Sequence, residues 1–249
     1  MTESGLGVRP ERVLKVLVAI ALLFFATTLF QRIWEQSHSD LGGIGIRFDT
    51  AEEGNLPTWF SGGLLLTAAA LFLLIAATRR AAGAGWAGRW ALLGAVFVYL
   101  SADEVGQIHE HTVKPLKHSV SDLTGVGGSA ARAIAVAVIV AVLLAFVAAY
   151  WPWLRAQPRR LSRLTVLAGL LYVTGALGLE VVSRFYELAG GARTGLFDGA
   201  LSAVEELLEM VGVSILIYAL LEQIAGVRVE LSGEALTGDS RGPISRTGD

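Results

Sequence analysis

Cysteine is absent from this chain, and proline, histidine and charged residues are scarce. Without cysteine there is no disulfide framework, no iron–sulfur cluster and no thiolate metal site. Only 17% of the 249 residues are charged, and the formal net charge of −2 argues against a nucleic-acid partner. The chain is instead 53% hydrophobic, with a mean hydropathy of +0.58. This composition is typical of an integral membrane protein and not of a soluble domain.

Long apolar runs account for this hydropathy. A helix needs roughly 20 apolar residues to cross a bilayer core of about 30 Å. Segments of this kind lie at 12–34, 57–78, 87–112, 129–151, 162–187 and 196–222. The sequence therefore predicts an all-α fold, an integral membrane bundle of six transmembrane helices over residues 1–227. The polar, Gly- and Ser-rich residues 228–249 are predicted to form a disordered tail.

Lysine and arginine are distributed unequally between the connections. They gather before the first span and in the second and fourth connections, where Arg79, Arg80 and Arg89, then Arg155 and Arg159, occur. Because positively charged connections stay in the cytoplasm, we expect both termini to be cytoplasmic. The predicted localisation is the cell membrane.

Three of the predicted spans carry acidic residues, each on one face. At about 100° per residue, the third span places its polar residues on a face about 120° wide. These are Asp103, Glu104, Gln107, Glu110 and His111. The fifth span has Glu180, Arg184 and Glu187 on one stripe, and the sixth has Asp198, Ser202, Glu205, Glu206 and Glu209. Three such faces predict a common polar interior.

The predicted depths of these residues also agree. At about 1.5 Å per residue, Asp103 lies roughly 25 Å from Trp86, in the outer half of the third span. Glu180 comes late in the outward-running fifth span, whereas Glu205 and Glu209 come early in the inward-running sixth span. We therefore expect one buried site that opens toward the extracytoplasmic side.

The charge balance of this site is unfavourable. Each ionised acid near the bilayer centre costs about 2.5–3.5 kcal/mol. Arg184 is the one fixed cation expected at the depth of six acids, namely Asp103, Glu104, Glu180, Glu205, Glu206 and Glu209. One arginine cannot offset six carboxylates, so protons, water or a metal cation must do so.

The third span contains the pattern S-x-D-E-x-x-x-x-H-E at 101–110. It resembles a helix of uncharacterised bacterial multi-pass membrane proteins, and the resemblance covers this helix alone. It implies that Ser101, Asp103, Glu104, His109 and Glu110 belong together. The helical wheel favours His111 over His109, so which histidine faces the site is left open.

Carboxylates with one or two imidazoles and no sulfur suit Zn, Mn or Fe(II). The candidate metal ligands are Asp103, Glu104, His109, Glu110, His111, Glu180, Glu205, Glu206 and Glu209, with Arg184 as an ion-pair partner. A divalent metal is therefore the expected cofactor, if the site holds one.

Three functions agree with such a site. The first is a metal-dependent membrane enzyme that activates water for attack on a lipid-type substrate. The second is a proton- or cation-coupled transporter or channel with an ionic substrate. The third is a non-catalytic subunit whose polar face docks another membrane protein. The lipid bilayer is the one partner common to all three.

Overall fold

In the computed structural model, residues 9–35, 38, 47–50, 54–108, 128–179, 182, 186 and 195–238 are described. Over these residues the chain is all-helical, with no strand. The helices are α1 (Pro10–Glu35), α3 (Leu56–Ala81), α4 (Ala87–Gly106), α6 (Gly128–Arg155), α7 (Arg159–Val173) and α9 (Gly195–Gly238), and a short π-helix, η1 (Thr174–Gly178), continues α7. The predicted all-α architecture is confirmed.

Within the described residues, five helical stretches are long and apolar enough to cross a membrane: Pro10–Glu35, Leu56–Ala81, Ala137–Arg155, Arg159–Gly178 and Gly199–Ala225. The predicted third span corresponds to α4, which has 20 residues and would extend about 30 Å. It carries three charged residues, Arg89, Asp103 and Glu104, and is not among these five stretches. The membrane character of the chain is thus established, and a sixth crossing by α4 stays a prediction.

Local sequence explains where α3 and α4 begin and end. Asn55 caps α3, because its side-chain oxygen accepts a hydrogen bond from the backbone N–H of Thr58 at 3.2 Å. Gly83, at φ 65°, allows the tight turn that follows α3. Gln107, at φ 52°, adopts the left-handed conformation that ends α4 and donates its N–H to the carbonyl of Asp103. The helix expected to run to residue 112 therefore ends at Gly106.

Two further boundaries differ from expectation. Pro152 lies inside α6, which continues to Arg155, because a proline in the last turn removes few helical hydrogen bonds. α9 continues to Gly238, past residue 227 where the predicted tail begins. No proline occurs between Gly195 and Pro243, so no proline ends this helix earlier. Disorder of the tail beyond residue 238 concerns residues outside those described.

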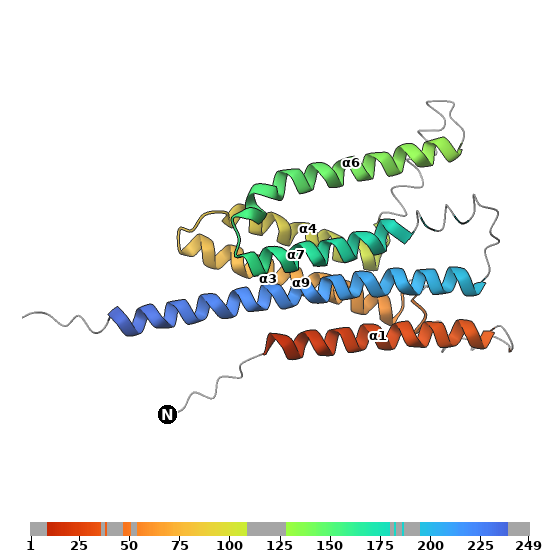
Figure 1. Cartoon of the computed structure of the whole chain (residues 1–249), viewed down its shortest axis with the longest axis horizontal. Coiled ribbons are helices and arrows are strands. Elements are labelled where there is room, and N and C mark those ends of the chain that lie inside the picture. Colours follow the sequence, from red (N-terminus) through yellow and green to blue (C-terminus); the bar gives the residue numbers. More distant parts are fainter. Residues whose placement is uncertain are drawn as a thin grey trace, which may run out of the picture.

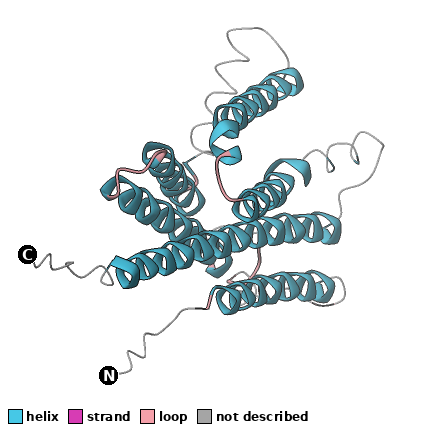
Figure 2. Ribbon diagram, turned by 60° about the vertical axis from the view of Figure 1, so that its left-hand side comes forward, coloured by secondary structure: helices cyan, strands magenta, loops and turns pink. Residues whose placement is uncertain are grey.

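α9 is the central helix of the bundle. It packs against α1, α3 and α7, while α3 and α4 form an extensively packed antiparallel hairpin (Figure 1). The core contains large, fully buried side chains from three of these helices, among them Phe72, Leu65, Trp90, Met210 and Ile217. Figure 2 shows the same helices gathered around α9 from another direction.

α6 stands apart from this bundle over most of its length (Figure 1). Most of its side chains from Val138 to Val147 are exposed, although they are apolar, and within this range Leu143 and Phe146 are partly buried. Contact with the bundle is made near its end, where Trp153 packs edge-on against Trp90 of α4 with ring centroids 5.0 Å apart. An exposed apolar helix faces lipid without cost in a bilayer, which agrees with the membrane assignment.

Exposed tryptophans lie at both ends of the bundle, and one of these ends also carries the arginines of two turns. Exposed Trp34 and Trp59 lie at one end, and exposed Trp86 and Trp151 lie at the other (Figure 1). Tryptophan is enriched at both membrane–water interfaces, so the two pairs agree with a bundle that crosses the bilayer. The end with Trp86 and Trp151 also carries the arginines of the α3–α4 and α6–α7 turns.

Candidate functional site

The last turn of α4 is held against α3 near Gly62. A Cβ atom added to Gly62 would lie 2.7 Å from the Cγ2 atom of Val105 and 3.8 Å from the Cγ atom of Glu104. The hydroxyl of Ser101 donates a hydrogen bond to the carbonyl oxygen of Gly62 at 2.8 Å. Close packing and this interhelical hydrogen bond therefore fix the part of α4 that carries Asp103 and Glu104.

A second close contact holds the acidic part of α9 against α7 and η1. A Cβ atom at Gly175 would lie 2.8 Å from both the carbonyl oxygen of Glu205 and the Cγ atom of Glu209. One at Gly212 would lie 2.8 Å from the carbonyl oxygen of Ala168. Only glycine permits the two backbones to approach so closely at these positions.

The π-helix η1 (Thr174–Gly178) lies at this same contact. Most π-helices are single-turn bulges within α-helices, and they occur frequently at functional sites. Tyr172, two residues before η1, is partly buried on α7. The π-helical turn η1 therefore lies beside the acidic residues Glu205 and Glu209 of α9.

Carboxylates from two helices meet in this region. Glu209 interacts electrostatically with Glu206, Glu104 and Glu205. Tyr172 interacts with Glu209, Glu104, Glu206 and Asp103. All six side chains are partly buried. We call the five acids (Asp103, Glu104, Glu205, Glu206 and Glu209) the acid cluster.

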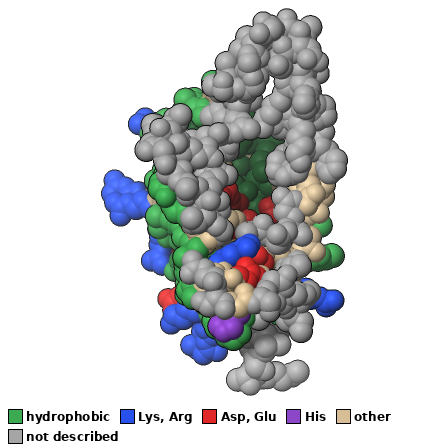
Figure 3. Space-filling view, turned by 90° about the vertical axis from the view of Figure 1, so that its right-hand side faces the viewer, with side chains coloured by type: hydrophobic (Ala, Val, Ile, Leu, Met, Phe, Trp, Pro, Cys, Tyr) green, Lys and Arg blue, Asp and Glu red, His purple; other side chains and the backbone are tan. Residues whose placement is uncertain are grey.

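Figure 3 shows the end of the bundle opposite the arginine-rich turns. Where described residues are visible at this end, hydrophobic side chains lie next to Asp and Glu side chains. The residues that surround the acid cluster on α3, α7 and α9 are also largely apolar. Carboxylates in such surroundings interact more strongly than carboxylates in water.

The structure describes half of the predicted site residues. It brings together the five members of the acid cluster, from α4 and α9. His109, Glu110, His111, Glu180 and Arg184 lie outside the described residues. His109 and His111 follow the end of α4, so the choice between them is not tested by the described residues. Within the described part of the chain, no three His, Asp or Glu side chains are grouped closely enough to hold a metal ion.

Sequence reasoning missed Tyr172 and Gly175. Both lie near the middle of the predicted fifth span, before its charged residues Glu180, Arg184 and Glu187. One signal was present: Tyr172 is a hydroxyl-bearing residue in an otherwise apolar run, followed closely by Gly175 and Gly178. The π-helical turn itself has no recognisable sequence pattern.

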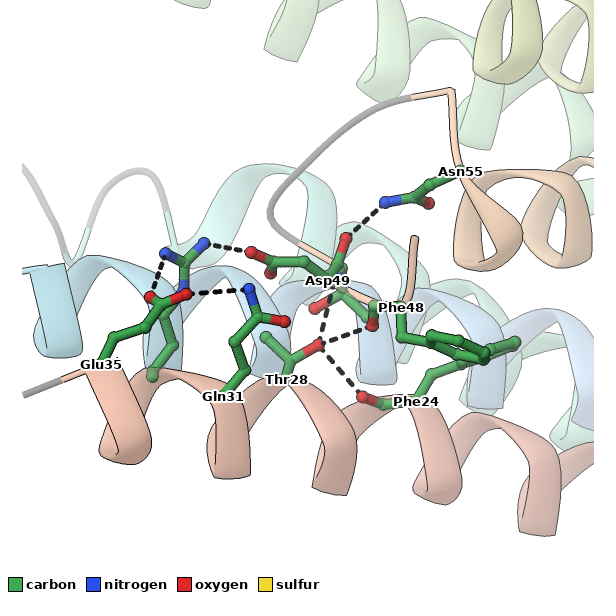
Figure 4. Close-up of polar contacts among 9 residues, drawn as sticks. Phe24, Thr28, Gln31, Glu35, Phe48, Asp49 and Asn55 are labelled. Carbon is green, nitrogen blue, oxygen red and sulfur yellow. Dashed lines mark hydrogen bonds and ion pairs between the residues drawn. The ribbon is translucent and has the colours of Figure 1, made fainter. Parts of the chain in front are cut away.

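A second polar group, also missed, joins α1 to α3. Arg32 of α1 binds the buried carboxylate of Asp49 at 2.5 Å and that of Glu35 at 3.5 Å. Thr28 accepts a hydrogen bond from the backbone N–H of Thr50 at 2.9 Å. The Asn55 side chain donates to the carbonyl oxygen of Asp49 at 2.6 Å (Figure 4). These contacts fasten residues 48–50 between the two helices.

The fold and the intramembrane acids define the class of this protein: an all-helical integral membrane protein with a polar interior. Residues 10–224 match the sequence model of a domain of unknown function, DUF8692, and the chain belongs to that family. No curated protein and no solved structure matches the chain.

Proposed function

We propose that this protein is a metal-dependent membrane enzyme that acts on a lipid-type substrate, and that its divalent cation is held by the acid cluster together with candidate ligands outside the described residues. The observation that carries the proposal is the meeting of carboxylates from α4 and α9 beside Tyr172. Like charges gathered at membrane depth repel one another, and a divalent cation converts that repulsion into attraction.

The type of metal follows from the ligands. Carboxylates favour Mn, Fe or Zn, and imidazole from His109 or His111 would strengthen the last two. Glu104 and Glu209 are the described acids that approach from different helices, so they are the first candidates to bridge α4 and α9 through a cation. The chemistry supplied by a bound metal is activation of water, with a neighbouring carboxylate as general base.

The surroundings of the site favour a lipid-type substrate. The acid cluster lies among largely apolar residues of α3, α7 and α9. An amphipathic molecule fits such a boundary, with its polar group at the acids and its chains against apolar side chains. The arginine-rich turns lie at the other end of the bundle, so by the positive-inside rule the acid cluster belongs to the extracytoplasmic half. The cell membrane is the proposed location.

Elemental analysis of the purified protein tests this proposal. We expect close to one equivalent of Mn, Fe or Zn in the wild-type protein and less than a tenth of that in Glu104→Gln/Glu209→Gln. Glu11→Gln, which removes an exposed carboxylate in the first turn of α1, is the control and should retain the metal. A wild-type protein without stoichiometric metal, or equal loss in the control, contradicts the proposal.

A proton- or cation-coupled transporter is the second candidate, and the π-helical turn favours it. Transporters often form ion sites where a membrane helix departs from regular α geometry. Thr174–Gly178 is such a departure, and Gly175 contacts Glu205 and Glu209. Ion-gradient-driven flux into proteoliposomes, lost in Glu209→Gln and kept in Glu11→Gln, would favour transport over catalysis.

A further inference from the structure

The α6–α7 turn, at the arginine-rich end of the bundle, is held by hydrogen bonds within the turn. The Gln157 side chain donates to the carbonyl oxygen of Trp153 at 3.1 Å. The hydroxyl of Ser162 donates to the carbonyl oxygen of Leu154 at 2.6 Å. Both contacts close the turn on itself, so side chains that project from it are held at fixed positions.

Arg160 is already occupied by acidic and phenolic partners. Its guanidinium binds both carboxylate oxygens of Glu222, at 2.7 and 2.9 Å, and the hydroxyl of Tyr218 at 2.6 Å. This bidentate pair joins the start of α7 to α9. Arg160 therefore fixes the position of the turn and is not available to a further anion on that side.

Three neighbouring arginines differ from Arg160. Arg155, Arg159 and Arg163 are exposed, and no acidic partner for them occurs among the residues that the structure describes. Arg159 and Arg163 are four residues apart and share one face of α7. Arg155 stacks on Trp151, with its guanidinium carbon 4.9 Å from the ring centroid. Trp151 is 45% exposed, as expected for a residue at the level of the lipid headgroups.

The other turn at this end provides a contrast. Arg79 donates to the carbonyl oxygen of Gly85 at 3.1 Å, and Arg89 donates to the carbonyl oxygen of Ala149. Those two guanidinium groups are engaged by the protein's own backbone. Arg80 of the same turn is exposed and, like Arg155, Arg159 and Arg163, has no acidic partner among the described residues. The α6–α7 turn therefore carries three such guanidinium groups, whereas the α3–α4 turn carries one.

We propose that Arg155, Arg159 and Arg163 form a binding surface for the phosphate group of anionic phospholipids. Guanidinium groups bind phosphate oxygens through paired hydrogen bonds, and the stacked Trp151 sets the depth at which the headgroup is met. This surface does not involve the acid cluster, so the lipid-binding proposal does not depend on the proposed catalytic function.

Lipid-dependent thermal stability tests the surface. The full-length protein in detergent is titrated with phosphatidylglycerol or, as the neutral comparison, phosphatidylcholine. Phosphatidylglycerol should raise the unfolding midpoint more, and the excess should shrink in high salt. Its apparent affinity should fall about fivefold for each arginine replaced, which corresponds to about 1 kcal/mol per charge near the surface.

Four variants make the test decisive. Arg155→Gln/Arg159→Gln/Arg163→Gln should lose the phosphatidylglycerol excess, and the single variants Arg159→Gln and Arg163→Gln should each weaken it if the triple variant does not fold. Arg79→Gln/Arg80→Gln removes charge from the other turn and should keep the excess. Retention in the triple and single variants, or equal loss in the control, overturns the proposal. An equal shift with inorganic phosphate alone assigns the site to a free anion and overturns the lipid assignment.

Discussion

Glycine is the residue that determines how closely the site-bearing helices approach. The Cβ atom of Gly175→Ala would lie 2.8 Å from the backbone oxygen of Glu205, which cannot move without shifting α9. We expect this substitution to lower the free energy of unfolding by about 1–3 kcal/mol, the usual cost of overpacking. The measurement is the thermal unfolding midpoint in detergent.

Gly169→Ala is the matched control on α7. A Cβ atom at Gly169 meets nothing within 4 Å, so the substitution should be neutral or stabilising by up to about 1 kcal/mol. Equal destabilisation by both substitutions would show that helix propensity, and not contact with α9, decides the effect.

The second prediction at this scale concerns the hydroxyl group of Ser101. Ser101→Ala removes the buried hydrogen bond to the carbonyl oxygen of Gly62 and should cost about 0.6–1.7 kcal/mol, the range for hydrogen bonds between membrane helices. Thr67→Ala is the comparison, because its hydroxyl bonds within its own helix to the exposed carbonyl of Gly63. Unfolding midpoints that fall equally for both would refute a specific role of Ser101 in joining α3 to α4.

At the scale of elements, residues 48–50 connect α1 to α3 through the Arg32–Asp49 ion pair. The Asp49 side chain is 2% exposed and that of Arg32 is 20% exposed. Asp49→Asn leaves a largely buried guanidinium without its closest carboxylate, so we expect a loss on the order of 3 kcal/mol. Chemical or thermal unfolding of the variant in detergent measures this loss.

Glu35→Gln is the control for that prediction. Glu35 is 26% exposed and lies 3.5 Å from Arg32, so its contribution should stay below about 1 kcal/mol. A larger effect from Glu35 than from Asp49 would reverse the assignment of the main partner of Arg32.

The elements themselves were well predicted by hydropathy, and their ends were not. Apolar length placed each predicted span over a helix of the structure. The end of α4 depends on the left-handed conformation of Gln107, and a glutamine in the sequence does not predict that conformation. Residues beyond Pro152 stay helical in α6 because a proline near a helix end breaks few hydrogen bonds.

The members of the acid cluster could be recognised in the sequence for a physical reason. Charged residues in apolar segments are expensive, so Asp103, Glu104 and Glu209 were conspicuous in the sequence. Tyr172 and Gly175 carry no charge and matter only because α7 and η1 touch α9, which is a property of the packing. The grouping of Arg32 with Asp49 likewise depends on how residues 48–50 return to α1.

At the scale of the whole molecule, the arrangement predicts the same side of the membrane for all arginine-rich turns. The chain has no cysteine, so single cysteines can be introduced and labelled from either side. Ala82→Cys, in the exposed α3–α4 turn, should react from the cytoplasmic side, and Arg47→Cys, before α3, from the outer side. Labelling of both from one side would contradict the six-span topology.

Cation binding by the acid cluster is the central claim, and removal of the cation tests it most directly. The measurement is the thermal unfolding midpoint of the wild-type protein in detergent, with and without EDTA. We predict a lower midpoint with EDTA, because a lost cation leaves the carboxylates of α4 and α9 facing one another. Glu104→Gln/Glu209→Gln should be insensitive to EDTA. A wild-type midpoint that does not change with EDTA would contradict the metal-dependent account and favour the transporter.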